Sequence, residues 1–562
     1  MVTYEFMLVN SLEKVFPKRT PNMLPKDTVT SGFIGETLSF QLAYKMEYND
    51  FELALQQVEL HIESELKDKL NIRSVELVPS ELPTYGEIDD NYITADPGLF
   101  PDLLLKKNDT ILSPYPGQWR ALWFDIEITE DMGFKSYPIT IKIEKDNEII
   151  WQDSLVIQTL NIELPIQELI HTEWFHADCL AQYYKVAVFS EKHWEIIENF
   201  IGTAAKHGMN MILTPVFTPP LDTKEGGERT TVQLVKVNKE GDCYTFDFKL
   251  LKRWINICKS KGIKYIEISH LFTQWGAKHA PKIMAEENGE TKRIFGWETD
   301  ATGKEYTNFL HQFLPALKIL LFEEDVLNNT YFHISDEPHE SHKETYAAAK
   351  EVVKEQLKGC KVIDALSSYT IFKDGIIEKP VPCNDYIQPF IDAKVPNLWT
   401  YYCCVQTIDV SNRFMAMPSA RNRILGVQLY LYNIEGFLHW GYNFYNSRYS
   451  VSEVDPYRVT DAGGAFPSGD PFIVYPAEDG TTNESIRLMV LSEALYDLRS
   501  LKLLETLTDR AYVESLIYED YTETITFKQY PKNPEYLFRL REKVNQEIVK
   551  AECGIVLGEE NI

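Results

Sequence analysis

The stretch TYFHISDEPH, residues 330–339, joins an apolar run to two adjacent acids and a proline. Its first five residues are mostly β-branched or aromatic, which predicts a buried strand. Asp336 and Glu337 follow that strand, and Pro338 prevents its continuation. A helical pattern over 343–358 comes next. Two carboxylates at the carboxyl end of a strand, ahead of a helix, occupy the position where α/β barrels hold their reactive groups.

Strand-like and helix-like segments alternate from 165 to 450, on both sides of this stretch. Such alternation favours βα units and a parallel sheet. About eight units are present, which predicts a closed (β/α)8 TIM-like barrel, with a doubly wound open sheet as the alternative. Neither a GxGxxG nor a GxxxxGK[ST] motif occurs, so dinucleotide and P-loop nucleotide binding lack their sequence signals.

The chain ahead of this region has a period of two. Leu38, Phe40 and Leu42 alternate with mainly polar residues, and turn residues separate such runs. Half-buried antiparallel strands of this kind predict an N-terminal β-sandwich, which we assign to residues 1–164. No cluster of acids, histidines or cysteines at motif spacing occurs there, so we expect a scaffold.

The remaining residues, 451–562, show helical periodicity, most clearly at 484–507 and 536–552. We expect this C-terminal helical segment to complete the barrel or to pack on it. The predicted fold class is therefore α/β plus β, with a β-sandwich, a barrel over 165–450 and a helical tail.

Composition restricts the partners that this chain can bind. Its 562 residues include 56 basic and 84 acidic side chains, and the net charge is −28. That charge repels phosphate backbones and anionic lipids, so we expect neither a nucleic acid partner nor membrane insertion. The sequence gives no indication of the oligomeric state.

Targeting and redox signals are weak. The first ten residues lack the basic and apolar regions of a signal peptide. The apolar stretch 313–322 is too short and too interrupted to span a bilayer. The eight cysteines form no CxxC pair and no dense disulfide framework. We therefore expect a soluble, reduced, cytoplasmic protein.

The pair Asp336–Glu337 is the leading catalytic candidate. An acid that protonates a leaving group needs a raised pKa, which a nearby carboxylate provides. In most glycosidases two carboxylates approach the scissile bond from separate strands, whereas adjacent acids approach from one side. That arrangement suits substrate-assisted cleavage, in which the 2-acetamido group of the sugar is the nucleophile. The competing interpretation is a solvated acidic pair at the start of a loop.

Residues at other predicted strand ends favour a sugar-binding cleft. Sugars need flat apolar walls for their C–H faces and short polar groups for their hydroxyls. The predicted substrate-binding residues are His270, Trp275, Tyr401, Trp440 and Tyr442. The histidines show neither HExxH nor another metal-ligand spacing, so we expect no metal and no cofactor.

Three segments resemble glycoside hydrolase family 123 and the broader DUF4091 group. They are FHISDEP at 332–338, LWTYYC at 398–403 and GDPFIVYP at 469–476, and the last is followed by SIRL at 485–488. They occur in the order expected for that family, and the similarity extends over residues 170–510.

The resemblance implies an exo-acting β-N-acetylgalactosaminidase that retains the anomeric configuration through an oxazolinium intermediate, without a metal. It implies that Glu337 is the general acid/base and that Asp336 orients the acetamido group of a small glycan or glycoconjugate. Two alternatives stay open. One is a two-carboxylate glycosidase for 2-hydroxy sugars, with a distant acid such as Glu173 as partner. The other is a non-catalytic glycan-binding protein on the same scaffold.

Overall fold

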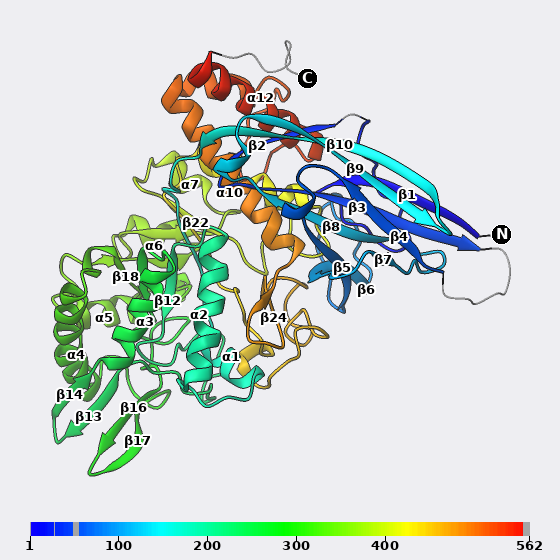
Figure 1. Cartoon of the computed structure of the whole chain (residues 1–562). Helices are drawn as coiled ribbons and strands as arrows, with labels where there is room; N and C mark the ends of the chain where they lie inside the picture. Colours follow the sequence, from blue (N-terminus) through cyan, green and yellow to red (C-terminus); the bar gives the residue numbers. More distant parts are fainter. Residues whose placement is uncertain (1, 27, 49–55, 555–562) are drawn as a thin grey trace.

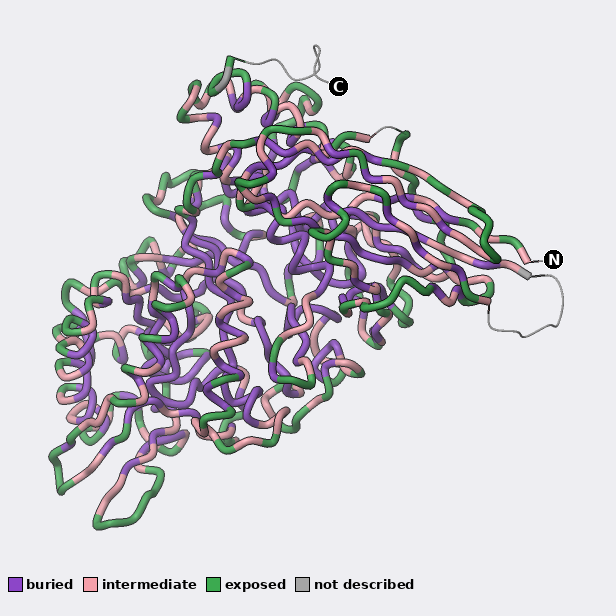
Figure 2. Tube along the Cα trace, in the orientation of Figure 1, coloured by how far each residue is buried: buried purple, intermediate pink, exposed green. Residues whose placement is uncertain are grey.

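The structure is a computed structural model that describes residues 2–26, 28–48 and 56–554. Figure 1 shows the N-terminal strands on one side and an α/β region on the other, with the C-terminal helices packed along both. Buried residues lie inside both parts and along the contact between them (Figure 2). One hydrophobic cluster includes Trp123 of the N-terminal part, Phe332 of the α/β region and Leu495 of the tail.

The described residues between 2 and 163 form two five-stranded sheets. The first has the order β1 (Val2–Asn10), β3 (Thr37–Tyr48), β8 (Arg120–Glu127), β5 (Asn71–Ser80), β6 (Gly98–Lys106). The second has the order β2 (Val29–Ile34), β10 (Glu148–Glu163), β9 (Lys135–Lys145), β4 (Val58–Glu63), β7 (Ile111–Leu112). The sheets share one apolar core, to which alternate residues such as Phe40 and Ile141 contribute.

The α/β region contains a curled sheet of seven parallel strands. Its order is β19 (Lys361–Val362), β18 (Thr330–Phe332), β15 (Tyr265–Ile268), β12 (Met211–Thr214), β11 (Ile170–Glu173), β23 (Gly436–His439), β22 (Trp399–Tyr401). The predicted alternation of helices with parallel strands is confirmed.

The described residues place seven strands in this sheet, and closure into a single sheet of eight strands is not shown. A separate two-stranded parallel sheet pairs β20 (Asp364–Leu366) with β21 (Pro380–Pro382). Only Ile363 separates β19 from β20, and an isolated parallel bridge joins Cys383 to Tyr401 of β22. Because these strands are very short, an irregularity of one residue is enough to interrupt the ladder of hydrogen bonds.

Helices connect the strands and cover the outside of the α/β region (Figure 1). They are α1 (Ala177–Tyr183), α2 (Glu191–Lys206), α3 (Lys249–Ser260), α4 (Lys304–Glu323), α5 (Lys343–Val353), α6 (Tyr369–Lys373), α7 (Gln388–Asp392), α8 (Ser419–Arg423) and α9 (Leu425–Leu431). A four-stranded sheet projects from one end of this region, in the order β14 (Cys243–Asp247), β13 (Lys236–Glu240), β16 (Ile283–Glu287), β17 (Glu290–Phe295).

The tail consists of a short hairpin, β24 (Tyr475–Pro476) with β25 (Thr482–Asn483), and the helices α10 (Ile486–Leu507), α11 (Arg510–Ile517) and α12 (Pro534–Cys553). The side chains of α10 are buried on most faces of the helix, as expected for a helix enclosed by other elements. Arg487 of α10 pairs with Asp102 of β6. In the described part of the chain, every helix is too short or too polar to cross a bilayer.

Candidate active site

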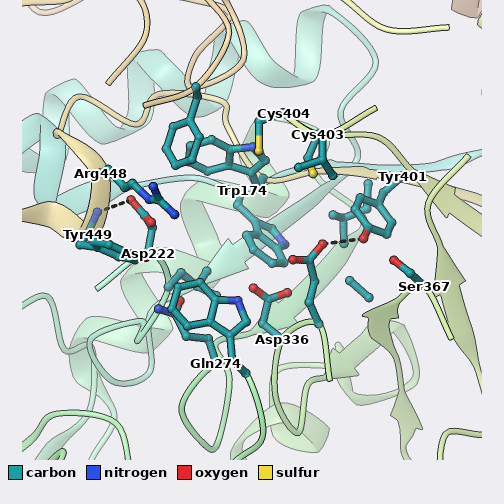
Figure 3. Close-up of a pocket in the computed structure, with 18 of the residues that line it drawn as sticks. Trp174, Asp222, Gln274, Asp336, Ser367, Tyr401, Cys403, Cys404, Arg448 and Tyr449 are labelled. Atoms are coloured by element: carbon teal, nitrogen blue, oxygen red, sulfur yellow. Dashed lines mark hydrogen bonds between the residues drawn. The ribbon is translucent and has the colours of Figure 1, made fainter. Parts of the chain in front are cut away.

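A cavity of about 450 Å³ lies at the carboxyl end of the parallel sheet. Its wall includes residues that follow four of the strands: Trp174 after β11, Asp336 and Glu337 after β18, Cys403 after β22, and Trp440 after β23. The strands are parallel, so these ends meet on one side of the sheet. Figure 3 shows Asp336 beside Trp174 near the middle of the cavity.

Asp336 and Glu337 both line this cavity. Glu337 has a backbone φ of 42°, which residues other than glycine seldom adopt. Neighbouring side chains of a regular strand would point to opposite faces, and the turn at Glu337 avoids that outcome. The N–H of Trp275 donates to the Asp336 carbonyl over 3.0 Å and holds the turn. Strained backbone of this kind is concentrated at functional sites.

The surroundings of the two acids determine how firmly they hold a proton. Within residues 2–26, 28–48 and 56–554 neither forms an ion pair, and the hydroxyl of Tyr401 donates to Glu337 Oε1 over 2.5 Å. Desolvation by the protein raises the pKa of Asp336 well above its ordinary value, Glu337 raises it further, and His333 opposes both effects. Such a pair keeps a proton at a pH where a solvated aspartate has lost it, which suits general acid chemistry.

A buried histidine anchors the end of β18 beneath the acids. His333 Nε2 lies 2.7 Å from Glu267 Oε1, and Nδ1 lies 3.2 Å from Asp364 Oδ1. Burial alone would lower the pKa of His333, but hydrogen bonds to Asp364 and Glu267 raise it to about 10. Glu267 also accepts from the indole of Trp174 over 2.8 Å. The same carboxylate therefore fixes the histidine and one indole of the cavity wall.

Ligand atoms of His270, His333 and Asp364 lie close enough together to hold a metal ion. A metal ligand needs a free nitrogen lone pair, whereas both His333 nitrogens face carboxylates and the ring is protonated. His270 stacks on His333, with 4.3 Å between ring centroids. Burial and that neighbouring cation lower the pKa of His270 well below its ordinary value. This donor set fits an ionic network better than a metal site.

Three of the predicted substrate-binding residues line the cavity: Trp275, Tyr401 and Trp440. Tyr401 is the last residue of β22, and Trp440 follows β23 directly. Trp275 has a φ of 56°, so its backbone is also strained. Together with Trp174 these rings give the cavity the apolar walls that sugar C–H faces require.

The other two predicted substrate-binding residues do not form part of the wall, and we correct the prediction for both. Tyr442 is fully buried, and its hydroxyl donates to the Phe200 carbonyl of α2 over 2.8 Å. His270 is buried behind the wall, against Trp174 and His333. A position near the end of a strand does not reveal whether the side chain points into the cavity or into the core.

Glu173, the distant acid of the two-carboxylate alternative, is also not part of the wall. Its side chain is fully buried, and Oε1 accepts from Arg413 Nη1 over 2.5 Å. Burial alone would raise the pKa of Glu173, but Arg413 and His171 lower it. A carboxylate with a buried arginine beside it is an internal ion pair, so Glu173 does not face the acid pair across the cavity.

Further side chains of the wall were not predicted. They include Tyr85, Trp174, Asp222, Gln274, Ser367, Arg448 and Tyr449. Trp174 directly follows β11 (Ile170–Glu173), so the rule that selected Trp440 could have found it. Asp222 and Arg448 come from long connections, and Tyr85 comes from the N-terminal part, between β5 and β6. No periodicity or motif in the sequence marks those three.

The GDPFIVYP segment supports the wall from behind. Asp470 Oδ2 accepts from the indole of Trp440 over 2.8 Å, and burial raises the pKa of Asp470 to about 7. Arg487 donates to the carbonyls of Gly469 and Phe472 over 2.5 and 2.7 Å. Two of the segments that carry the family resemblance, GDPFIVYP and SIRL, thus meet in one structure that holds Trp440.

The chain is similar to known proteins in sequence and in fold. Residues 174–504 match the family model for the glycoside hydrolase 123 catalytic domain. Among curated proteins no match is found. A solved family 123 glycoside hydrolase from Clostridium perfringens superposes with a TM-score of 0.73 at 17% identity, over 98% of each chain. A GH5 xyloglucanase from Bacteroides ovatus covers 84% of this chain and 98% of its own, at 6% identity, with a TM-score of only 0.30.

Proposed function

The chain belongs to glycoside hydrolase family 123 and is a glycoside hydrolase, and on that basis we propose a substrate and a mechanism. The enzyme removes terminal β-linked N-acetylgalactosamine, or a related 2-acetamido sugar, by an exo-acting, retaining reaction. The observation that carries this proposal is the pair of adjacent carboxylates that line one cavity and form no ion pair within the described residues. The Clostridium perfringens enzyme is described by its hydrolysis of glycolipid glycans, which supports a glycan substrate here.

In the first step Glu337 protonates the glycosidic oxygen, while the carbonyl oxygen of the acetamido group attacks the anomeric carbon. The bond from that carbon to the glycosidic oxygen breaks, the alcohol leaves, and an oxazolinium ring forms. Asp336 accepts a hydrogen bond from the acetamido N–H and stabilises the positive charge that develops on the ring. In the second step Glu337 removes a proton from water, which opens the ring with the β configuration retained.

The surrounding side chains support these roles. Tyr401 donates to Glu337 and thereby fixes the carboxyl group that exchanges the proton. Trp174, Trp275 and Trp440 line the cavity and supply flat surfaces for the sugar ring. Asp336 comes three residues after His333, whose two carboxylate partners immobilise the end of the strand.

A second part of the proposal concerns the fold. We propose that β19 and β20 act as one strand, so that the seven-stranded and two-stranded sheets form a single (β/α)8 barrel over 165–450. The isolated bridge between Cys383 and Tyr401 supports closure between β21 and β22. Residues 1–164 and 451–562 would then be flanking parts that hold the barrel.

The test uses chromogenic aryl glycosides. We expect hydrolysis of 2-acetamido sugars but not of the matching 2-hydroxy sugars, and inhibition by a thiazoline mimic of the cyclised acetamido group. Asp336→Asn and Glu337→Gln are expected to lose activity, whereas Glu344→Gln, an exposed position on α5, is the matched control. Cleavage of 2-hydroxy sugars without thiazoline inhibition would refute the proposal.

A further inference from the structure

The cavity has two unlike ends. Figure 3 shows Tyr401 and Ser367 on one side of Asp336 and Trp174, and Asp222, Arg448 and Tyr449 on the other. We call Asp222, Gln274 and Arg448 the distal cluster. All three line the cavity, and none of them takes part in the mechanism described above.

Two connections clamp each other at this end. The N–H of Tyr449 donates to Asp222 Oδ2 over 2.9 Å, and Ser450 Oγ donates to the Asp222 carbonyl over 2.8 Å. The N–H of Lys224 donates to the Tyr449 carbonyl over 3.2 Å. The backbones of Asp222, Tyr449 and Ser450 have φ values of 37°, 60° and 51°. Such strain persists only where surrounding contacts over-determine the conformation, so the cluster is held in a fixed geometry.

The distal cluster has hydrogen-bonding groups without partners in the described part of the chain. One oxygen of Asp222 accepts from Tyr449, and the other has no partner. The Arg448 guanidinium stacks on the Tyr449 ring at 4.7 Å, but it makes no hydrogen bond or ion pair. Gln274 donates to the Thr223 carbonyl over 3.1 Å, which leaves its amide oxygen available. A carboxylate, a guanidinium and an amide oxygen therefore face the cavity as free acceptors and donors.

The charges of the wall restrict what can bind there. Arg448 is opposed by three carboxylates of the same cavity, those of Asp222, Asp336 and Glu337. A sulfate or carboxylate substituent on the sugar would gain one cation and meet three acids. Hydroxyl groups, which both donate and accept, match the mixed set of acceptors and donors without a charge penalty.

We propose that the distal cluster binds ring hydroxyls of the terminal sugar, with Asp222 accepting from one hydroxyl and Arg448 donating to its neighbour. It thereby selects a neutral sugar that carries no further residue at those positions. This inference rests on the proposed function, because it assumes that the sugar lies between the acid pair and the cluster. The residues act on binding and orientation, and the bond-breaking step stays with Asp336 and Glu337.

The experiment is a double-mutant cycle, in which one change is a substitution in the distal cluster and the other is the removal of a hydroxyl group from the sugar. The ligands are methyl 2-acetamido-2-deoxy-β-galactoside and its 3-, 4- and 6-deoxy analogues. Their Kd values are measured by calorimetry on Glu337→Gln, which prevents turnover, with and without Asp222→Asn or Arg448→Met. The matched aryl glycosides give kcat/KM on the otherwise wild-type chain. Asp222→Asn keeps the acceptor for the Tyr449 N–H, so the clamp between the connections is preserved.

We expect one deoxy analogue to bind about 10- to 100-fold more weakly than the parent, as for a lost charged hydrogen bond. Substitution of Asp222 or Arg448 should raise the Kd of the parent sugar by a similar factor. It should leave the Kd of that analogue almost unchanged. Arg458→Met, at a neighbouring exposed position (side chain 84% exposed), should change nothing. Two results would overturn the inference. One is that the effects of the substitution and of the missing hydroxyl on Kd multiply for every analogue. The other is that the substitution leaves the Kd of the parent sugar unchanged.

The two proposals fail in different ways. If no 2-acetamido glycoside is hydrolysed but the coupling appears in binding, the proposed function is wrong and the distal cluster assignment stands. If hydrolysis is observed and the effects of the substitution and of the missing hydroxyl on Kd multiply, the proposed function stands and the assignment of the distal cluster is wrong. If none of the sugars binds, both are wrong.

Discussion

Two groups of enclosed acids in this molecule differ in what faces them. At the contact between the N-terminal sheets and the tail, Asp102 accepts hydrogen bonds from both Nε and Nη2 of Arg487, over 2.8 and 2.9 Å. Asp497 is bonded in the same way by Arg423. In the cavity, Asp336 and Glu337 lie side by side, and within the described residues neither forms an ion pair.

The difference distinguishes acids that have a structural role from acids that are suited to catalysis. A buried carboxylate with an arginine fork is neutralised and fixed, so its proton affinity serves no reaction. A carboxylate pair without a cation is unfavourable for stability, and proteins keep such pairs mainly where a reaction needs them. The comparison predicts that substitutions in the two groups affect different measurements.

The largest effect is expected at Glu337. In the proposed mechanism Glu337 protonates the leaving alcohol, so Glu337→Gln should lower kcat on a natural glycan by about 10²- to 10⁴-fold. With an activated aryl leaving group the loss should be smaller, because less protonation is needed. Steady-state kinetics on both substrates checks this. Equal losses on both substrates would contradict the role of Glu337 as the acid. Unfolding in urea should show no loss of stability, because the substitution relieves repulsion within the acid pair.

Arg487→Met tests the other group. It leaves Asp102 buried without its cation, and the free energy of unfolding should fall by about 3–5 kcal/mol. Urea titration measures the change. The control is Arg539→Met, since the Arg539–Asp520 pair is exposed and should contribute at most about 1 kcal/mol. Equal changes in the two variants would contradict the contrast between the two groups.

Asp336→Asn should affect stability and activity in opposite directions. The Asp336 pKa is raised in the folded protein by desolvation and by Glu337. Near pH 3 the group is protonated in both states, but at higher pH the unfolded chain releases the proton first, and stability falls as pH rises. The variant cannot ionise, so its free energy of unfolding should be higher than that of wild type at pH 7, with no gain near pH 3.

The pH dependence of activity gives a second measurement on the same residue. If the carboxylate of Asp336 must accept from the acetamido N–H, kcat/KM should rise with pH through the raised pKa. The acidic limb should therefore lie above the range of an ordinary aspartate, near pH 4, and should disappear in the residual activity of Asp336→Asn. A limb at ordinary pH would contradict the account of this pair.

The smallest effect is expected at Asp470, which lies behind the wall of the cavity and holds Trp440. Asp470→Leu removes the acceptor of the Trp440 indole, and kcat/KM should fall about 10-fold, chiefly through KM. Asp470→Asn keeps an acceptor and should lose less. Kinetic assays of both variants decide the question, and an equal loss in the two variants would mean that the charge of Asp470 matters more than its orientation of Trp440.

Local sequence pattern predicted much of the fold. The period of two over 137–143 corresponds to alternate burial in β9, and the helical periodicity of the tail corresponds to α10 and α12. The separation of the seven-stranded sheet from the two-stranded sheet was not predicted, because strands of two to four residues carry little periodicity.

The site was predictable where chemistry lies next to a strand. The acid pair, Trp275, Tyr401 and Trp440 were found from their positions near strand ends. Tyr442 was selected by the same rule, but its side chain turns into the core toward Phe200. Asp222 and Arg448 could not be found, since two long connections meet only in three dimensions.

Participation of the acetamido group is the central claim, and N-acyl substitution tests it most directly. The measurement is kcat for aryl β-glycosides whose acetamido methyl group carries zero, one, two or three fluorine atoms. Each fluorine withdraws electron density from the attacking carbonyl oxygen, so kcat should fall steeply across the series. A rate that is independent of fluorination would show that this oxygen is not the nucleophile and would contradict the account.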